Sequence, residues 1–192
     1  MAASQRLFAA VALPPALREQ AARWAAALAA DPATGRGVRW SRPEGLHLTL
    51  HFFGNVPEGE LARVAGALEA GVAAAPGAFD LALEGLGAFP TAARPRVIWI
   101  GAVGEGRARL ERLQAALAAE IAGAGFPVES RPFHAHVTLG RVAGAPPRGL
   151  RAAIEAGAGR RLGEFRVEAV TLYRSELSRD GSRYTELERW GL

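Results

Sequence analysis

Residues 46–53 read Leu-His-Leu-Thr-Leu-His-Phe-Phe, and residues 134–139 read His-Ala-His-Val-Thr-Leu. In both stretches polar and apolar side chains alternate, as is typical of a β-strand with one buried face. Residues 47–50 (HLTL) and 136–139 (HVTL) repeat one His-x-Thr-x motif in the two halves of the chain. The repeat indicates two similar halves, each built around one such strand.

Strand geometry decides which side chains of the motifs lie together. Side chains two residues apart point to the same face of a strand, so His47 shares a face with Thr49, and His136 shares one with Thr138. The residues between them are apolar and would point the other way. Two such strands facing each other would line a cleft with two imidazoles and two hydroxyls.

This set of groups suits the cleavage of a phosphate ester. One neutral imidazole can accept a proton from the nucleophile, while the other, protonated, donates to the leaving oxygen. The hydroxyls can hold the phosphoryl oxygens as charge develops. A single His-x-Thr-x motif would be weak support, because most single histidines lie on the surface or in the core. The hypothesis of a phosphate-cleaving site rests on the presence of two copies in matching strands.

Periodicity predicts the other elements around the two motifs. We expect strands at residues 7–13, 79–86, 97–103, 165–172 and 184–187, and helices at residues 15–30, 58–72, 107–122 and 148–156. Residues 31–37 and 73–77 are expected to form a loop and a turn, and Asp180-Gly181 a turn between the last two strands. The sequence contains neither a Walker nor a Rossmann glycine motif.

Composition excludes several classes of function. The 192 residues contain no Cys, so disulfides, thiolate metal sites and cysteine nucleophiles are excluded. The net charge of +4 is mild, and every basic residue is Arg, as a GC-rich genome would produce. No segment approaches the ~18 apolar residues needed to span a bilayer. We therefore expect a cytoplasmic protein.

The motifs and their flanks resemble the two-histidine (2H) phosphoesterase superfamily. Within it, they are similar to the bacterial and archaeal RNA 2′,3′-cyclic phosphodiesterases, historically called 2′-5′ RNA ligases. The resemblance covers nearly the whole chain, through residues 6–11, 46–56, 131–141, 172–177 and 184–187. One departure is Ala135, where the family usually has Pro before the second histidine; it removes no chemical group.

The resemblance implies an α+β fold for residues 1–192 as a single bilobal domain. Two antiparallel sheets, related by pseudo-two-fold symmetry, would face a central cleft with helices on their outer sides. The expected partner is RNA that ends in a 2′,3′-cyclic phosphate, with tRNA fragments as a candidate source. No cofactor and no metal are expected, and the default oligomeric state is a monomer.

The family's roles assign His47 as the proton donor to the departing 3′ oxygen and His136 as the base that activates water. Thr49 and Thr138 would bind the cyclic phosphate, and the product would carry a 2′-phosphate. The reverse reaction would join such an end to a 5′-hydroxyl. The residues themselves leave the acid and base roles open, because the two motifs are nearly symmetric.

Further candidates flank the motifs. Arg141 matches the family's motif-associated arginine, a phosphate clamp, but alternation puts it out of phase with His136 unless the strand ends or bulges at Gly140. The other candidate contacts to nucleotide or RNA are Phe53, Phe133, Tyr184, Arg42 and Arg131. For the three aromatic residues the alternative is core packing, and for the two arginines it is a solvated charge.

Two more histidines lie beside the motifs. In a regular strand His51 shares the face of His47, and His134 shares that of His136. We expect both at the rim of the cleft or directly behind the catalytic pair, as candidate contacts to nucleotide or RNA. A metal site is the less favoured reading, since neither strand carries an Asp or Glu.

Two other functions remain open at this point. One is a phosphodiesterase for a small cyclic nucleotide such as ADP-ribose 1″,2″-cyclic phosphate. The other is a non-catalytic module that binds RNA ends, although a pure binder has no need of an acid–base pair.

Overall fold

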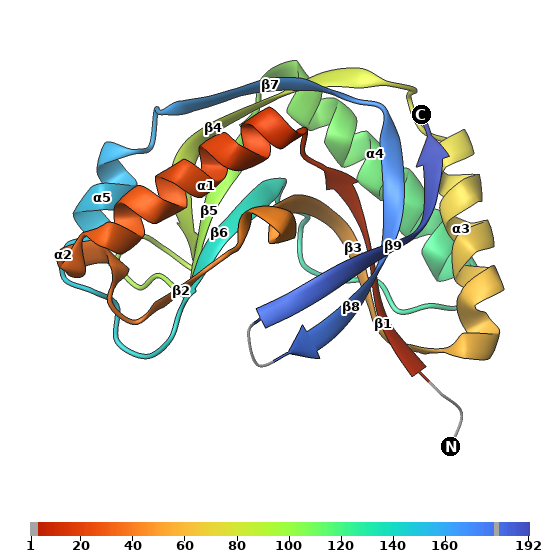
Figure 1. Cartoon of the computed structure of the whole chain (residues 1–192). Helices are drawn as coiled ribbons and strands as arrows, with labels where there is room; N and C mark the ends of the chain where they lie inside the picture. The colour runs from red at the N-terminus through yellow and green to blue at the C-terminus, as the bar shows by residue number, and fades with distance from the viewer. Residues whose placement is uncertain (1–3, 179–180) are drawn as a thin grey trace.

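The computed structural model describes residues 4–178 and 181–192 (Figure 1). The strands are β1 Ser4–Ala12, β2 Val38–Trp40, β3 His47–Pro57, β4 Phe79–Phe89, β5 Val97–Val103, β6 His136–Val142, β7 Arg161–Val167, β8 Ala169–Ser178 and β9 Gly181–Gly191. The helices are α1 Pro15–Ala30, α2 Pro32–Gly35, α3 Leu61–Ala73, α4 Gly104–Gly123 and α5 Leu150–Ala156, with short 3-10 turns η1 Pro43–Gly45 and η2 Glu58–Glu60.

The strands form one strongly curled antiparallel sheet in the order β7-β4-β5-β6-β3-β1-β8-β9, with β2 paired to β6. The two motif strands, β3 and β6, are neighbours at its centre and are joined through the pair Leu48–Val137. The expected α+β class is confirmed. The two sheets that we expected are the two halves of this one sheet, because β3 and β6 pair where the halves meet.

The helices form two groups (Figure 1). α3 and α4 pack against each other, and α4 also contacts β3, β4 and β5. Gly71 of α3 makes this approach close, because a Cβ at that position would collide with Leu117 of α4. α1, α2 and α5 gather at the other end of the molecule, near β2 and β7. Together the two groups cover apolar surface that the sheet alone would expose.

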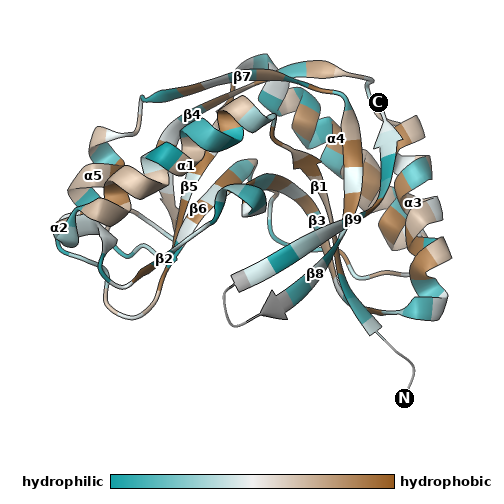
Figure 2. Ribbon diagram, in the orientation of Figure 1, coloured by the Kyte–Doolittle hydropathy of each residue, from teal (hydrophilic) through white to brown (hydrophobic). Residues whose placement is uncertain are grey.

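The core is continuous from one half of the sheet to the other. Leu48 and Leu50 of β3 and Val137 and Leu139 of β6 are buried in it. Helix α4 buries one stripe of side chains at three- and four-residue spacing: Leu110, Leu113, Leu117 and Ile121. Figure 2 shows the middle of β1 and β3 coloured largely as apolar. The apolar half of each motif strand therefore holds the two lobes together.

Several element boundaries differ from the predictions. Residues 31–37 contain the short helix α2, because Asp31 accepts a hydrogen bond from the Ala33 backbone N–H at 2.8 Å and Pro32 suits a first turn. The strand predicted at residues 165–172 is two strands, β7 and β8, separated at Glu168. β2 was not predicted, because three residues are too few for periodicity to show. Of the predicted Asp180-Gly181 turn, Asp180 lies outside the described residues.

Within residues 4–178 and 181–192, no helix has both the length and the apolar character needed to cross a membrane.

Candidate active site

The pairing of β3 with β6 brings the two motifs together. Leu48 and Val137 are direct antiparallel partners. In this register His47 lies across from Thr138, and Thr49 lies across from His136, all four on the sheet face opposite the core. We call this the histidine face. The four side chains are half-buried. Two imidazoles and two hydroxyls therefore occupy one small patch at the junction of the two halves.

Each motif strand bulges at the fourth position of its motif. In the pairing of β1 with β3, Ala10 and Ala9 oppose Thr49 and His51, so Leu50 is the extra residue. In the pairing of β5 with β6, Trp99 and Ile98 oppose Thr138 and Gly140, so Leu139 is the extra residue. A bulge reverses the alternation that follows it.

The bulges bring Phe52 and Arg141 to the histidine face. Each lies five positions after the histidine of its motif. Phe52 is 58% exposed, the more exposed of the two large apolar side chains that stand out among the described residues. Arg141 could share the face of His136 only if the strand ended or bulged at Gly140, and the structure has a bulge there. Phe52 was missed in the sequence, because the bulge depends on the partner strand.

The expectation that His51 shares the face of His47 was wrong, because the bulge at Leu50 reverses the alternation. The bulge turns His51 away from His47, and its side chain is only 6% exposed. Its ring packs edge-on against Phe53 at 4.6 Å between centroids. Phe53 is itself buried and packs against Phe126 at 5.7 Å, so it belongs to the core rather than to a nucleotide site.

His51 predicts a pH dependence of stability. Burial lowers its pKa from the ordinary 6.5, so the folded chain binds fewer protons than the unfolded chain as pH falls below about 6.5. Stability should be fully present above that value and decline below it, down to the lowered pKa. The variant His51→Leu should show a smaller decline between about pH 7.5 and about pH 5 in urea unfolding. His47 and His136 act with the same sign, so an unchanged decline in the variant would contradict the assignment to His51.

Backbone carbonyls orient both catalytic candidates. Nδ1 of His136 lies 2.6 Å from the carbonyl oxygen of His134. A carbonyl can only accept, so Nδ1 carries the proton and Nε2 of the neutral ring keeps its lone pair free. His47 has the equivalent partner, the Gly45 backbone, which raises the pKa of His47. In both motifs the partner is the residue two positions earlier, so the local symmetry extends to the groups that hold the rings.

The surroundings favour the neutral form of both histidines in the free protein. The pKa of His47 is lowered from its ordinary 6.5 to about 4, mainly by burial and also by the charge of His136, while the Gly45 hydrogen bond acts in the opposite direction. Burial also lowers the pKa of His136, and the charges of His134 and Arg141 add to this effect. These effects indicate that His136 is close enough to His47, and Arg141 close enough to His136, to lower the pKa of the neighbouring imidazole.

Aromatic rings surround each catalytic candidate. Phe8 of β1 stacks on His47 with centroids 4.7 Å apart, and Tyr184 of β9 contacts the same ring edge-on at 5.2 Å. Around His136, Phe89 of β4 lies at 4.9 Å and Trp99 of β5 at 6.3 Å. Trp99 is on the histidine face because it pairs with Thr138.

The other predicted contacts divide into near and remote residues. Tyr184 is half-buried beside His47, as a substrate contact requires. His134 is exposed and packs edge-on against Phe89 at 5.2 Å, close to His136. Phe133 is partly buried against the core, as in the alternative that we weighed.

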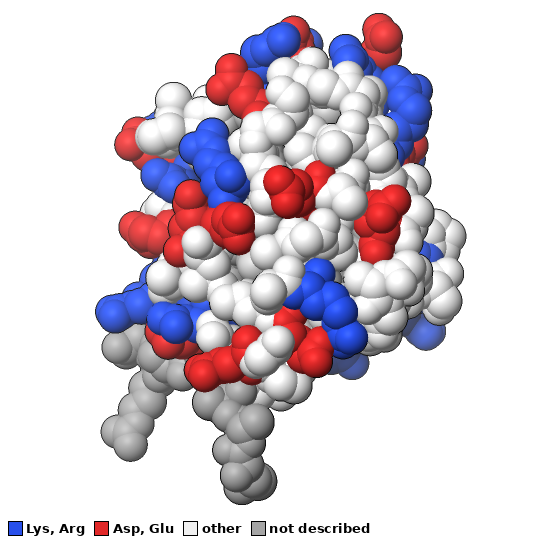
Figure 3. Space-filling model, turned by 90° about the vertical axis from the view of Figure 1, so that its right-hand side faces the viewer, with Lys and Arg blue, Asp and Glu red and all other residues white. Residues whose placement is uncertain are grey.

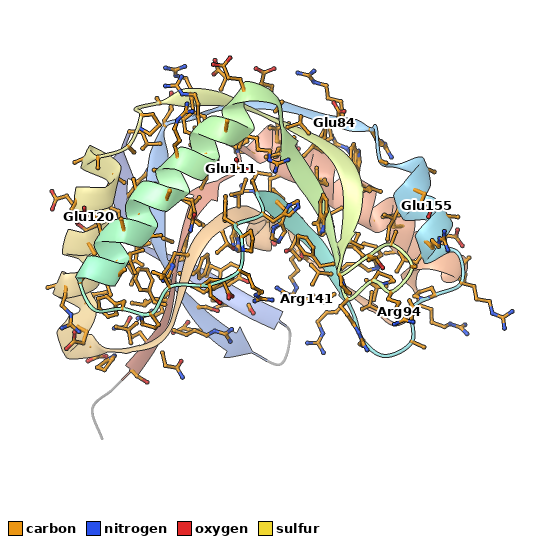
Figure 4. The ribbon with its side chains drawn as sticks, turned by 180° about the vertical axis from the view of Figure 1, so that it is seen from behind. Glu84, Arg94, Glu111, Glu120, Arg141 and Glu155 are labelled. Atoms are coloured by element: carbon orange, nitrogen blue, oxygen red, sulfur yellow. The ribbon has the colours of Figure 1, made fainter. Side chains whose placement is uncertain are left out.

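The three predicted arginine contacts also divide into residues near the catalytic histidines and residues remote from them. Arg42 lines an apolar groove of about 550 Å³ between α1 and β2, separate from the surroundings of His47. Arg131 is exposed and forms an ion pair with Glu129 at 2.7 Å, which favours the solvated charge. Figure 4 shows Arg141 and Arg94 at the same edge of the molecule, away from the labelled glutamates Glu84 and Glu111. Of the three predicted arginines, Arg141 has the electrostatic link to a catalytic candidate.

A recess of about 250 Å³ opens beside His47. Phe8, Tyr173 and Tyr184 line it on the sheet side, and α1 and η1 close it from the other side. No group of three or more His, Cys, Asp or Glu within the described ranges is arranged to hold a metal ion. The face of the molecule seen in Figure 3 carries interspersed arginines and acidic residues without an extended patch of one charge.

Comparisons with known proteins agree with this site. Residues 13–179 match the family described as the 2′-5′ RNA ligase superfamily. The chain is 36% identical to the RNA 2′,3′-cyclic phosphodiesterase of Escherichia coli, over 100% of this chain and 99% of that protein. It is 35% identical to the protein of the same name from Methanothermobacter thermautotrophicus, over 95% and 96% of the two chains. The crystal structure of E. coli LigT complexed with 3′-AMP superposes with a TM-score of 0.77 at 31% identity, covering 99% of each chain.

Two His-x-Thr-x strands at the centre of one curled antiparallel sheet define a two-histidine phosphoesterase. Within that class, the family match and the full-length relatives show that the chain belongs to the 2′-5′ RNA ligase superfamily.

Proposed function

We propose that this chain hydrolyses the 2′,3′-cyclic phosphate at the end of an RNA to a 2′-phosphomonoester. The pair Leu48–Val137 carries the proposal, because its register groups two imidazoles and two hydroxyls on one face. Full-length relatives named RNA 2′,3′-cyclic phosphodiesterase support the choice of substrate.

The site suggests one role for each group. His136 accepts a proton from water at Nε2, since its Nδ1 is held by the His134 carbonyl. The water oxygen bonds to phosphorus as the bond to the 3′ oxygen breaks, and His47 gives its proton to that oxygen. Thr49, Thr138 and Arg141 hold the phosphoryl oxygens. The reaction needs one protonated and one neutral histidine, and ends with the two roles exchanged.

The proposal has further parts that follow from the sequence. Residues 1–192 act as one bilobal domain, as a monomer in the cytoplasm, and without metal or cofactor. The partner is RNA with a 2′,3′-cyclic end, with tRNA fragments as a candidate source. The same groups can run the reaction backwards, joining such an end to a 5′-hydroxyl, because each histidine can serve as acid or base.

The test is hydrolysis of a short RNA that ends in a 2′,3′-cyclic phosphate, with EDTA present. We expect a product that carries a 2′-phosphate and a 3′-hydroxyl. A product with a 3′-phosphate, or no turnover, would overturn the proposal. ADP-ribose 1″,2″-cyclic phosphate serves as the competing substrate. If RNA is the substrate, its kcat/KM should fall steeply with salt, because bound phosphates release counterions.

The lowered pKa values predict where activity depends on pH. In the free enzyme the pKa of His47 is lowered to about 4, and that of His136 is lowered below 6.5. Because catalysis needs the singly protonated pair, kcat/KM should be bell-shaped with both limbs below about 6.5. A bound phosphate anion stabilises the imidazolium, so the limbs of kcat should lie at higher pH. Identical limbs in kcat and kcat/KM would contradict this prediction.

Phe52 predicts an effect on substrate binding. Its ring is exposed on the histidine face and lies 5.8 Å from Phe8, so it can stack on a base of the bound RNA. The variant Phe52→Ala should lower kcat/KM for oligonucleotides about tenfold, since a base stacked on an aromatic ring is worth about 1–3 kcal/mol. Phe52→Tyr keeps the ring and should keep the activity. Equal losses in both variants would contradict a stacking role.

A further inference from the structure

The recess beside His47 has a wall that the proposed chemistry does not use. Glu186 of β9 pairs with Tyr173 of β8, which pairs with Phe8 of β1, so the three side chains form one row on the histidine face. Arg18, in the first turn of α1, lines the opposite side. The recess therefore places an arginine and a carboxylate on either side of aromatic rings.

Arg18 and Glu186 have no protein partner in the part of the chain that the structure describes. No ion pair within 4.0 Å and no side-chain hydrogen bond there includes either of them. Burial is the main cause that raises the pKa of Tyr173; Glu186 also raises it, whereas a hydrogen bond with Thr171 and the charges of Arg189 and Arg18 lower it. Glu186 and Arg18 therefore both lie near Tyr173, with Arg189 as a second cation, and Glu186 and Arg18 form no ion pair with each other.

One nucleobase matches this arrangement of donors and acceptors. Guanine presents the acceptors O6 and N7, to which an arginine binds with two hydrogen bonds. Its neighbouring edge presents the donors N1–H and N2–H₂, which a single carboxylate can accept. Adenine reverses the pattern, with an amino group toward the arginine and the N1 acceptor toward the carboxylate. A second carboxylate at the recess, Glu44, also favours an edge rich in donors.

The proposed chemistry also points to this side of the site. The proton donor to the 3′ oxygen must lie next to the terminal ribose, and the recess lies next to His47. The base attached to that ribose is therefore the group within reach of the recess. Half-buried Tyr173 lines the recess and supplies an aromatic ring for it, backed by the buried Phe8, whose ring stacks on Tyr173 with centroids 5.2 Å apart.

We propose that the recess beside His47 binds the base of the 3′-terminal nucleotide and selects guanine, with Arg18 and Glu186 as the residues that read it. The inference rests on the proposed phosphodiesterase activity and names its preferred substrate.

The test uses four RNA trinucleotides with 2′,3′-cyclic phosphate ends that differ only in the terminal base. We expect kcat/KM for guanine to exceed that for adenine by roughly 10- to 100-fold, the effect of one well-placed bidentate contact. Turnover of all four within about threefold of each other would overturn this inference and leave the phosphodiesterase proposal standing, since one bidentate contact exceeds that range. No turnover of any of the four would overturn the proposed function itself.

Two variants and a matched control localise the selectivity. Glu186→Gln should shift the guanine-to-adenine ratio toward adenine, because an amide can pair with adenine through two hydrogen bonds. Arg18→Met should lower the ratio of guanine to uracil. Glu188→Gln, on the same strand but opposite the core residue Leu172, should keep the wild-type ratios. Thermal unfolding of each variant checks the fold. An unchanged ratio in Glu186→Gln, or an equal change in Glu188→Gln, would overturn the assignment.

Discussion

Replacing His136 or His47 with alanine is expected to lower kcat for hydrolysis of the cyclic phosphate by about 10²- to 10⁴-fold each, the usual contribution of a positioned acid or base. The reason is the geometry of the pair. Both rings are held by the carbonyl two residues earlier, and both stand on one face beside the two threonines. His51 cannot take over the role of His47, because it is turned into the core.

Two readouts identify the loss as chemical. The double variant should be about as slow as either single variant, because groups that act as a unit are strongly non-additive. Each single variant should also lose one limb of the pH profile of kcat/KM. Single-turnover hydrolysis across the acidic range measures both effects.

His51→Leu is the matched control for these two variants. It removes an imidazole from the same strand as His47, but from the face that packs against Phe53. Its kcat should stay close to that of the wild type. If His51→Leu is as slow as His47→Ala, or if His47→Ala keeps a bell-shaped profile, the two-histidine mechanism is wrong.

Leu48→Ala is expected to have the largest effect on stability, a loss of about 2–5 kcal/mol in the free energy of unfolding. Leu48 is fully buried, and it pairs with Val137 at the point where the two halves of the sheet join. The truncation leaves a cavity at a junction that packed neighbours on both sides cannot easily fill. The loss is a large share of the roughly 5–15 kcal/mol that stabilises a typical domain. Urea unfolding at neutral pH measures it.

Thr49→Val, at the next residue, should change stability little and lower activity strongly. Thr49 is half-buried on the histidine face, so the loss of its hydroxyl should change stability by only about 0.5 kcal/mol. Its kcat should fall by roughly 10²-fold, the effect of removing one group that stabilises developing charge. If Thr49→Val unfolds as readily as Leu48→Ala, the assignment of the two faces is wrong.

Sequence periodicity predicted the elements whose pattern is long and local. Helix α4 was expected at residues 107–122 and forms Gly104–Gly123. Strand β5 occupies the predicted range, Val97–Val103. Short elements such as β2 were missed, because three residues become a strand only through their partner, here β6.

The site was predicted in its centre and less well at its rim. His47, Thr49, His136 and Thr138 lie on one face, as alternation within each motif requires. Beyond the fourth position of each motif, alternation gave the wrong face for His51 and hid Phe52. Phe8, Tyr173 and Glu186 come from strands that no local pattern connects with the motifs.

The sequence by itself determined the chemistry of this protein, because two repeated motifs carry the reacting groups and alternation puts His and Thr of each motif on one face. Only the tertiary structure decided which side chains surround those groups. A bulge depends on a mismatch in register with the partner strand, and a recess depends on elements that meet only after folding, as β9 and α1 do beside His47. Both properties arise from pairing between distant segments, which the order of residues along one strand does not reveal.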